Sequence, residues 1–204
     1  MKLYNSIGPN PHMVRMYAAE LGVDLPIVDI DLMAGENRQA PYLSKNPSGQ
    51  SPALEFDDGT VLAEITAICQ YLDDITEGKT LIGDTPLERA MTHMWTRRVD
   101  LNICEPMGNG FRYAEGLQIF EGRMITIPEA ADGLKRITQN KLGWLDEQMS
   151  DGREFIAGAK LSMADVLLYC MVVFFSGVGQ PLNPEHNHVQ SWFNRMAARP
   201  SAEA

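Results

Sequence analysis

Residues 52–72 read PALEFDDGTVLAEITAICQYL, and the succession of local structures is plainest there. Pro52 precedes a candidate strand over 53–56, and the turn signal Asp57-Asp58-Gly59 separates it from a return strand over 60–62. The apolar residues that follow recur at helical spacing and are Ile65, Ile68, Cys69 and Leu72. This part of the chain therefore predicts a β-hairpin followed by a helix.

The residues before the hairpin predict a β-α-β unit. A candidate strand covers 2–5, and Pro11 suits the opening of a helix, where a missing N–H costs nothing. Gly22 ends that helix, whose apolar face consists of Val14, Tyr17, Ala18 and Leu21. Alternating apolar and acidic residues predict a second strand over 27–31, and the polar stretch 35–45 predicts a short helix.

The rest of the chain predicts helices only. Thr85-Pro86-Leu87-Glu88 forms a capping box, and the helix behind it is expected to end just before Pro106. Pro128 suits the start of another helix. A second capping box, Ser162-Met163-Ala164-Asp165, precedes the apolar run 166–175, which predicts a central buried helix.

A last amphipathic helix is expected over 189–196. The pattern predicts an α+β protein with two cores. An N-terminal thioredoxin-like domain (βαβ-ββα) is expected over 1–78, a linker over 79–84 and an all-helical C-terminal domain over 85–204.

Composition and charge exclude several classes. The chain has 204 residues, 17 basic and 27 acidic side chains and a net charge of -10, which argues against nucleic acid as a partner. The longest apolar run has ten residues, about half of a membrane span, and we expect no membrane association. The three cysteines, Cys69, Cys104 and Cys170, lie far apart, which is typical of neither a disulfide framework nor a zinc site. We therefore expect a cytoplasmic protein without a metal.

The thioredoxin-like interpretation places a reactive group at the N-terminus of the first helix, where the helix dipole and free N–H groups favour a thiolate. That corner reads Gly8-Pro9-Asn10-Pro11-His12, and no cysteine precedes residue 69. Any thiol must therefore come from a ligand. The amide of Asn10 and the hydroxyl of Ser6 are then candidate donors to a bound thiolate, although Asn10 is equally a candidate helix N-cap.

Three motifs together resemble the cytosolic glutathione transferases. Asn46-Pro47-Ser48-Gly49-Gln50-Ser51-Pro52-Ala53-Leu54 resembles their N-P-x-G-x-x-P-x-L segment, and residues 62–72 resemble the start of their E-S-x-A-I-x-x-Y-L helix. Ser162 to Asp165 resembles the capping box in their second domain. The matches follow the family's order over nearly the whole chain.

The resemblance implies roles in the segment around Pro52. It implies a cis peptide bond before Pro52, and a backbone at Ser51 that pairs with the cysteinyl part of glutathione like an added strand. Gln50 and Asn37 complete the implied binding residues on this side. Without the resemblance, Pro52 would be interpreted as an ordinary turn proline.

A second implied binding region is the start of the following helix. Glu64 matches the acid that faces the glutamyl end of glutathione, whose carboxylate suits a helix N-terminus. Ile65 replaces the serine that usually follows, so only its backbone N–H remains and Thr66 is a candidate substitute. The alternative for Glu64 is an acid that stabilises only its own helix.

The catalytic corner departs from the tyrosine, serine and cysteine classes of the family. Tyr4 lies one position too early and is expected to point into the core. Asn10 stands where bacterial members of the cysteine type have their cysteine, and a related bacterial group carries a similar asparagine corner. We therefore expect Asn10 first and Ser6 second as catalytic residues, with Asn5 as a helper.

The resemblance implies a homodimeric glutathione transferase, with a role in detoxification. Glutathione would be the co-substrate, and its thiol would be activated for attack on a small hydrophobic electrophile. The helical domain would line the electrophile pocket, with candidates Trp95, Arg97, Arg98, Phe111 and Tyr113. Two alternatives stay open, namely a glutathione-dependent disulfide or peroxide reductase and a non-enzymatic binding protein.

Overall fold

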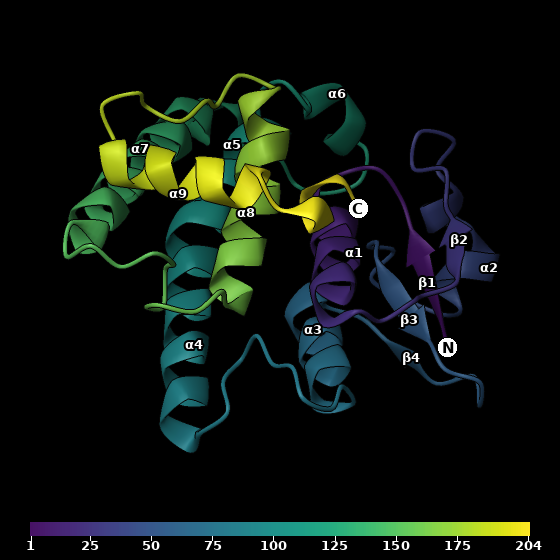
Figure 1. Ribbon diagram of the computed structural model, residues 1–204. Helices are drawn as coiled ribbons and strands as arrows, with labels where there is room; N and C mark the ends of the chain where they lie inside the picture. The colour runs from purple at the N-terminus through teal and green to yellow at the C-terminus, as the bar shows by residue number, and fades with distance from the viewer. The chain divides into compact units, whose positions relative to one another are not determined.

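The computed structural model describes all 204 residues and divides into two compact units. The first unit comprises Met1–Asp84 together with Pro200–Ala204, and the second comprises Thr85–Arg199 (Figure 1). The last five residues were expected in the helical domain. They belong to the first unit because the short helix η4 (Pro200–Glu203) packs on the first helix, where His12 Nε2 lies 3.1 Å from the carbonyl oxygen of Ala202.

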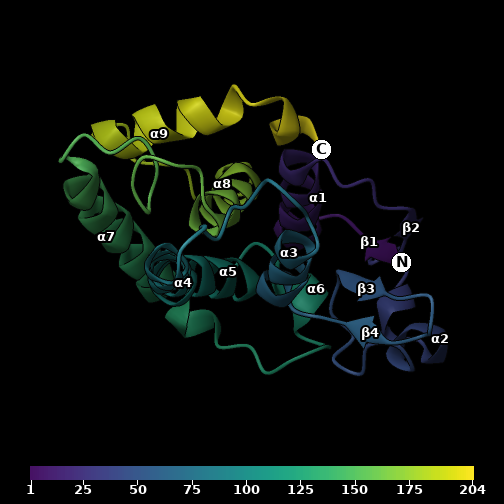
Figure 2. The same cartoon turned by 60° about the horizontal axis from the view of Figure 1, so that its bottom comes forward.

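The first unit is built on a four-stranded sheet in the order β2-β1-β3-β4. The strand β1 (Lys2–Asn5) pairs in parallel with β2 (Ile27–Asp29) and antiparallel with β3 (Ala53–Glu55), which pairs with β4 (Val61–Leu62). The helices are α1 (Pro9–Leu21), η1 (Glu36–Arg38), α2 (Ala40–Leu43) and α3 (Ile65–Asp74). The predicted βαβ-ββα order is therefore confirmed. Helices α1 and α3 pack together on one side of the strands, and α2 lies on the other (Figure 2).

The start of α1 differs from the sequence expectation. The helix begins at Pro9 rather than Pro11, because both prolines fit a first turn that leaves its N–H groups unpaired. Gly8 is the N-cap, with a φ of 112° that is unfavourable for residues with a Cβ. Asn10 is consequently the second helical residue, and the interpretation of Asn10 as the N-cap is wrong.

The strand β2 is shorter than predicted. It ends at Asp29 instead of residue 31, because the chain turns immediately afterwards. The carboxylate of Asp31 accepts hydrogen bonds from the N–H groups of Met33 and Ala34, at 2.8 and 2.9 Å, and thereby closes a local turn.

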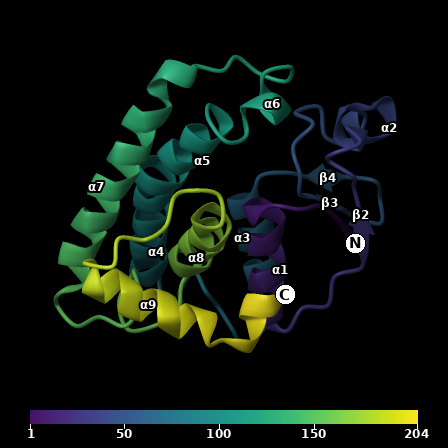
Figure 3. The same ribbon diagram turned by 90° about the horizontal axis from the view of Figure 1, so that it is seen from above.

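The second unit is entirely helical. Its elements are α4 (Pro86–Val99), the π-helical η2 (Asp100–Cys104), α5 (Glu105–Arg112), α6 (Leu117–Phe120), η3 (Pro128–Ala130), α7 (Ala131–Met149), α8 (Met163–Ser176) and α9 (Asn187–Ala197). Both predicted capping boxes are present, at Thr85 with Glu88 and at Ser162 with Asp165. The predicted buried helix is α8, which packs against α4, α5 and α9 (Figure 3).

Helical structure continues past Pro106, contrary to the expectation, because α4, η2 and α5 follow one another without a break. The π-helical turn η2 leads directly into α5, where Pro106 lies in the first turn and needs no N–H partner. Gly108 and Gly110 lie inside α5 rather than in a loop. A Cβ at Gly110 would come within 2.9 Å of Lys135 Cγ, so glycine permits α5 and α7 to approach closely. No helix of the structure has the length and apolar character needed to cross a membrane.

Candidate functional site

The loop between β1 and α1 meets the loop before β3 at two serines. Ser6 is buried, at 6% exposure, and its hydroxyl forms a 2.8 Å hydrogen bond with the hydroxyl of Ser51. The Ser51–Pro52 peptide bond is cis, as the resemblance implied. The structure thus brings together two predicted site residues that lie 45 positions apart.

Asn10 carries the only backbone N–H among the first three residues of α1, because Pro9 and Pro11 have none. The next N–H, that of His12, donates to the Gly8 carbonyl at 3.4 Å. The side-chain Oδ1 of Asn10 is buried without a hydrogen-bond partner, and its Nδ2 donates to no protein acceptor. The donors for an anion at this helix end are therefore one backbone N–H and one side-chain amide.

Asn5 and Tyr4 are engaged elsewhere. The Nδ2 of Asn5 donates to Asp29 at 2.7 Å and its Oδ1 accepts from Arg15, which ties the ends of β1 and β2 to α1. Asn5 is therefore a structural link, and one N–H and the oxygen of its amide are used within the protein. Tyr4 is 7% exposed and donates to Glu55 at 2.5 Å, so it points into the protein as expected.

The loop over residues 46–52 is held by side-chain amides. Asn37, at 4% exposure, donates through Nδ2 to the carbonyl of Gly49 at 2.6 Å, and its Oδ1 is buried without a partner. Gly49 has a φ of 62°, and a Cβ there would lie 3.0 Å from the Asn37 carbonyl. Gln50 exposes its side chain, while its carbonyl accepts from Tyr42 and Asn46. Asn37 thus supports this loop from inside.

Glu64 is the N-cap of α3 and the one non-glycine residue with a positive φ, 69°. Its side chain is exposed and forms no capping hydrogen bond with its own helix. The N–H groups of Ile65, Thr66 and Ala67 have no protein acceptor, and the N–H of Ile68 donates to the Glu64 carbonyl. This helix end can therefore accept a carboxylate beside an exposed acid.

A hollow of about 400 Å³ adjoins the β1–α1 loop. Its rim is acidic, because Asp29, Asp31 and Glu36 are exposed. No sequence motif indicates this hollow, since its walls come from separate turns. The lining residues are Ile7, Asp29, Ile30, Asp31, Leu32, Met33 and Glu36.

The five pocket candidates of the helical domain all belong to the second unit, where each has contacts of its own. Arg98 and Arg153 both stack on the ring of Trp95, at 5.0 and 5.1 Å. Arg97 forms a solvent-exposed ion pair with Asp100 at 3.9 Å. Phe111 packs against Phe174 and Phe175, and Tyr113 is half-buried.

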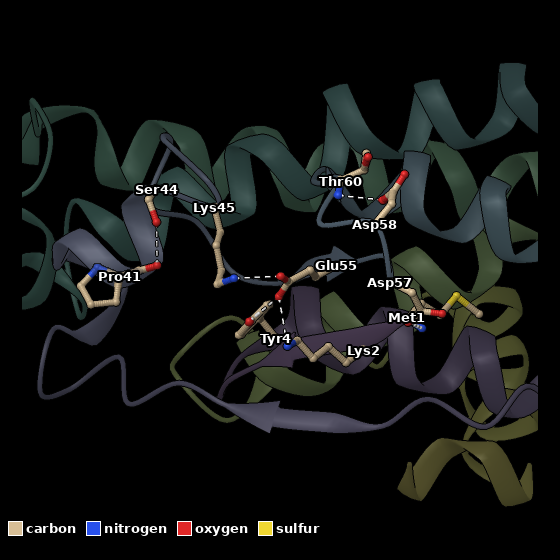
Figure 4. A network of polar contacts seen from close by, with 10 residues as sticks. All are labelled: Met1, Lys2, Tyr4, Pro41, Ser44, Lys45, Glu55, Asp57, Asp58 and Thr60. Atoms are coloured by element: carbon tan, nitrogen blue, oxygen red, sulfur yellow. Dashed lines mark hydrogen bonds and ion pairs between the residues drawn. The ribbon is translucent and has the colours of Figure 1, made fainter.

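A charged network lies on the sheet beside the 46–52 loop (Figure 4). Glu55 accepts from Tyr4 at 2.5 Å and from Lys45 at 2.9 Å, and Lys2 lies 3.3 Å away. The hydrogen bond from Tyr4, followed by that from Lys45, holds the pKa of Glu55 at about 2. Glu55 therefore remains an anion that joins β1, β3 and the segment after α2.

These features define a two-domain protein with a thioredoxin-like first domain, a cis-proline loop and a helical second domain. The family models described as "Glutathione S-transferase, N-terminal domain" and "Glutathione S-transferase, C-terminal domain" match residues 1–74 and 128–195. The chain is 32% identical to glutathione S-transferase 2 of Saccharomyces cerevisiae, over 96% of this chain and 84% of that protein. It belongs to the glutathione S-transferase family.

Solved structures agree with this assignment. The crystal structure of Gtt2 from Saccharomyces cerevisiae superposes with a TM-score of 0.92 at 32% identity, covering 100% of this chain and 99% of that one. A glutathione S-transferase domain-containing protein of Marinobacter aquaeolei gives a TM-score of 0.92 at 34% identity, covering 99% and 100%. The predicted family and fold are thereby confirmed.

Proposed function

We propose that this protein is a glutathione transferase that activates the thiol of glutathione for attack on a small apolar electrophile. Family membership gives the activity, since the relatives at 32% and 30% identity are named glutathione S-transferases. The observation that carries the site assignment is the pair of helix N-termini in one unit. One has the free amide of Asn10, and the other has the unpaired N–H groups behind Glu64.

In the proposed binding mode, glutathione pairs with the backbone of Ser51 as an added strand. Its glutamyl carboxylate lies at the N-terminus of α3, and its ammonium faces Glu64. Gln50 and Asn37 shape the loop that carries Ser51. Their contacts within the loop support this assignment.

The thiol then lies at the N-terminus of α1. Donation from the Asn10 amide, and from the Ser6 hydroxyl once it turns away from Ser51, stabilises the thiolate, which lowers the thiol pKa from about 8.5. The thiol proton leaves to solvent, and the thiolate sulfur forms a bond to the electrophilic carbon while the leaving group departs with its electron pair. None of these steps uses a metal.

Two further proposals concern assembly and location. We expect two copies of the chain to associate, with α4 at the interface, and we expect the protein to detoxify electrophiles in the cytoplasm. All three cysteines are free and buried, which suits a reducing compartment. The named relatives favour neither the reductase nor the non-enzymatic alternative.

The test is glutathione affinity by calorimetry. Glu64→Ala should weaken binding by about 10-fold, because it removes the charged partner of the glutamyl ammonium. Glu77→Ala, which removes another exposed acid of the first unit, is the matched control and should bind normally. Full affinity in the Glu64 variant would refute the site, and absence of conjugation of chlorodinitrobenzene by the wild type would refute the activity. Turnover of hydroxyethyl disulfide instead would favour the reductase.

A further inference from the structure

The carbonyl oxygen of Gln50 is anchored by two buried side chains. Tyr42 donates its hydroxyl to this oxygen at 2.5 Å, and Asn46 donates its Nδ2 at 2.8 Å. Tyr42 is 3% exposed and Asn46 is 5% exposed. Neither residue was expected in the site, yet both act on the residue just before Ser51.

The anchor controls the direction of the next N–H group. The Gln50–Ser51 peptide bond is trans, so its C=O and N–H lie in one plane and point in opposite directions. Because Tyr42 and Asn46 hold the carbonyl from one side, the Ser51 N–H must point to the other side. That N–H has no acceptor within the protein.

We propose that Tyr42 is a positioning residue, which aims the Ser51 N–H at the cysteinyl carbonyl of glutathione through the Gln50 carbonyl. The proposal rests on the proposed function, in which Ser51 pairs with glutathione as an added strand. Asn46 has the same role from the loop itself, where its Oδ1 also accepts from the Ser48 hydroxyl at 2.9 Å.

Tyr42 is itself held in place. Its ring meets the ring of Tyr4 edge-on, with centroids 5.9 Å apart, and Tyr4 is fixed by Glu55 (Figure 4). Glu55 is in turn paired with Lys45, next to the Asn46 that shares the Gln50 carbonyl. Burial raises the pKa of Tyr42, so its hydroxyl stays a neutral donor at physiological pH. The contacts of Tyr4, Glu55 and Lys45 in Figure 4 therefore help to fix Tyr42 and, through it, the Gln50 carbonyl.

The experiment compares two buried tyrosines of the first unit that each donate one hydrogen bond. Tyr42→Phe keeps the ring and removes the donor to Gln50, and it should weaken glutathione binding about 3- to 10-fold. Tyr17→Phe removes a 2.7 Å hydrogen bond to Asp73 in the same unit and is the matched control. It should lower the unfolding midpoint and leave glutathione affinity within about twofold of the wild type. Calorimetry and thermal unfolding measure both quantities.

A glutathione analogue with an ester between cysteine and glycine gives a second measurement. The cysteinyl carbonyl of this ester is a weaker acceptor. Replacing glutathione by the ester should therefore lower the affinity of the wild type by a larger factor than that of Tyr42→Phe. Asn46→Asp removes the other donor to Gln50 while keeping the side-chain shape, and it should behave like Tyr42→Phe. This variant replaces Tyr42→Phe if the latter does not fold.

The outcomes distinguish the positioning role of Tyr42 from the proposed function. Equal affinity of Tyr42→Phe and wild type for glutathione, or equal weakening by Tyr17→Phe, would overturn the positioning role. The positioning role would also be overturned if the wild type and the variants lost the same factor of affinity for the ester analogue relative to glutathione. A wild type that does not bind glutathione would refute the proposed function instead.

Discussion

The N-termini of α1 and α3 carry the same helix dipole and offer very different donors. In α1, two of the first three residues are prolines, so the Asn10 N–H stands alone. In α3, the first three residues all have N–H groups without a protein acceptor. Both helices begin after a residue with positive φ, which is Gly8 in one and Glu64 in the other.

The different numbers of N–H donors suit two different anions, a carboxylate at α3 and a thiolate at α1. A carboxylate has two oxygens and accepts several hydrogen bonds, so a row of N–H groups suits it. A thiolate is one large atom, for which a single N–H and one adjustable side-chain amide suffice. The dipole alone would attract either anion, about equally, since each end carries about half a unit charge. Donor number therefore separates the proposed carboxylate site from the proposed thiolate site.

The largest expected effect comes from making α3 resemble α1. Ile65→Pro removes the first N–H of α3 at a helix position that tolerates proline. Glutathione affinity should fall about 10- to 100-fold, because a hydrogen bond to a carboxylate is lost. Ile65→Ala removes the same side chain, keeps the N–H and serves as the control. Similar calorimetric affinities for the two variants would mean that this N–H does not bind the carboxylate.

A smaller effect is expected at the α1 end. Asn10→Ala removes a donor to the thiolate, which disfavours the charged form and raises the pKa of bound glutathione toward about 8.5. The conjugation rate at neutral pH should fall about 10-fold and recover as the pH rises. Asn10→Asp, nearly identical in shape, adds a repelling charge and should raise that pKa further. The pH profile of kcat/KM with each variant measures the shift, and an unmoved profile would exclude Asn10 from the reaction.

The sequence patterns correctly predicted the features that depend on residues close together in the chain. Capping boxes, helix faces and the hairpin depend on residue spacing, and the cis bond before Pro52 followed from the family motif. The N-cap of α1 was missed because Pro9 and Pro11 are each acceptable at a helix start. Only the positive φ of Gly8 selects Pro9 as the first residue.

Long-range contacts were beyond the sequence patterns. Tyr42 lies in a four-residue helix without a motif, and its role arises only when its hydroxyl meets the Gln50 carbonyl. The segment 200–204 joins the first unit through contacts with α1, which no periodicity indicates. The unpaired Oδ1 atoms of Asn10 and Asn37 likewise follow from burial rather than residue type.

The two positive-φ caps provide a comparison of stability. Glu64→Gly relieves an unfavourable backbone conformation and should stabilise the first unit by up to about 1 kcal/mol, while weakening glutathione binding. Gly8→Ala should destabilise it by about 1–2 kcal/mol, although a Cβ at this position meets no atom within 4 Å. Denaturant unfolding checks both values. If Glu64→Gly were instead destabilised, the Glu64 side chain itself would stabilise the first unit, and ligand binding would not be needed to explain the positive φ at this residue.

The smallest expected effect is a pH dependence of stability that comes from the first turn of α1 and not from that of α3. Burial lowers the pKa of His12, one residue after Pro11, whereas the first turn of α3 contains no titratable group. Because the unfolded chain binds the proton more tightly, stability should fall as the pH drops below about 6.5. His12→Gln should flatten this decline, and His188→Gln, which alters an exposed histidine of the second unit, should not. Unfolding midpoints measured on either side of that pH test the difference. If the midpoint changed equally with pH in the wild type and in His12→Gln, His12 would not contribute to the pH dependence of stability.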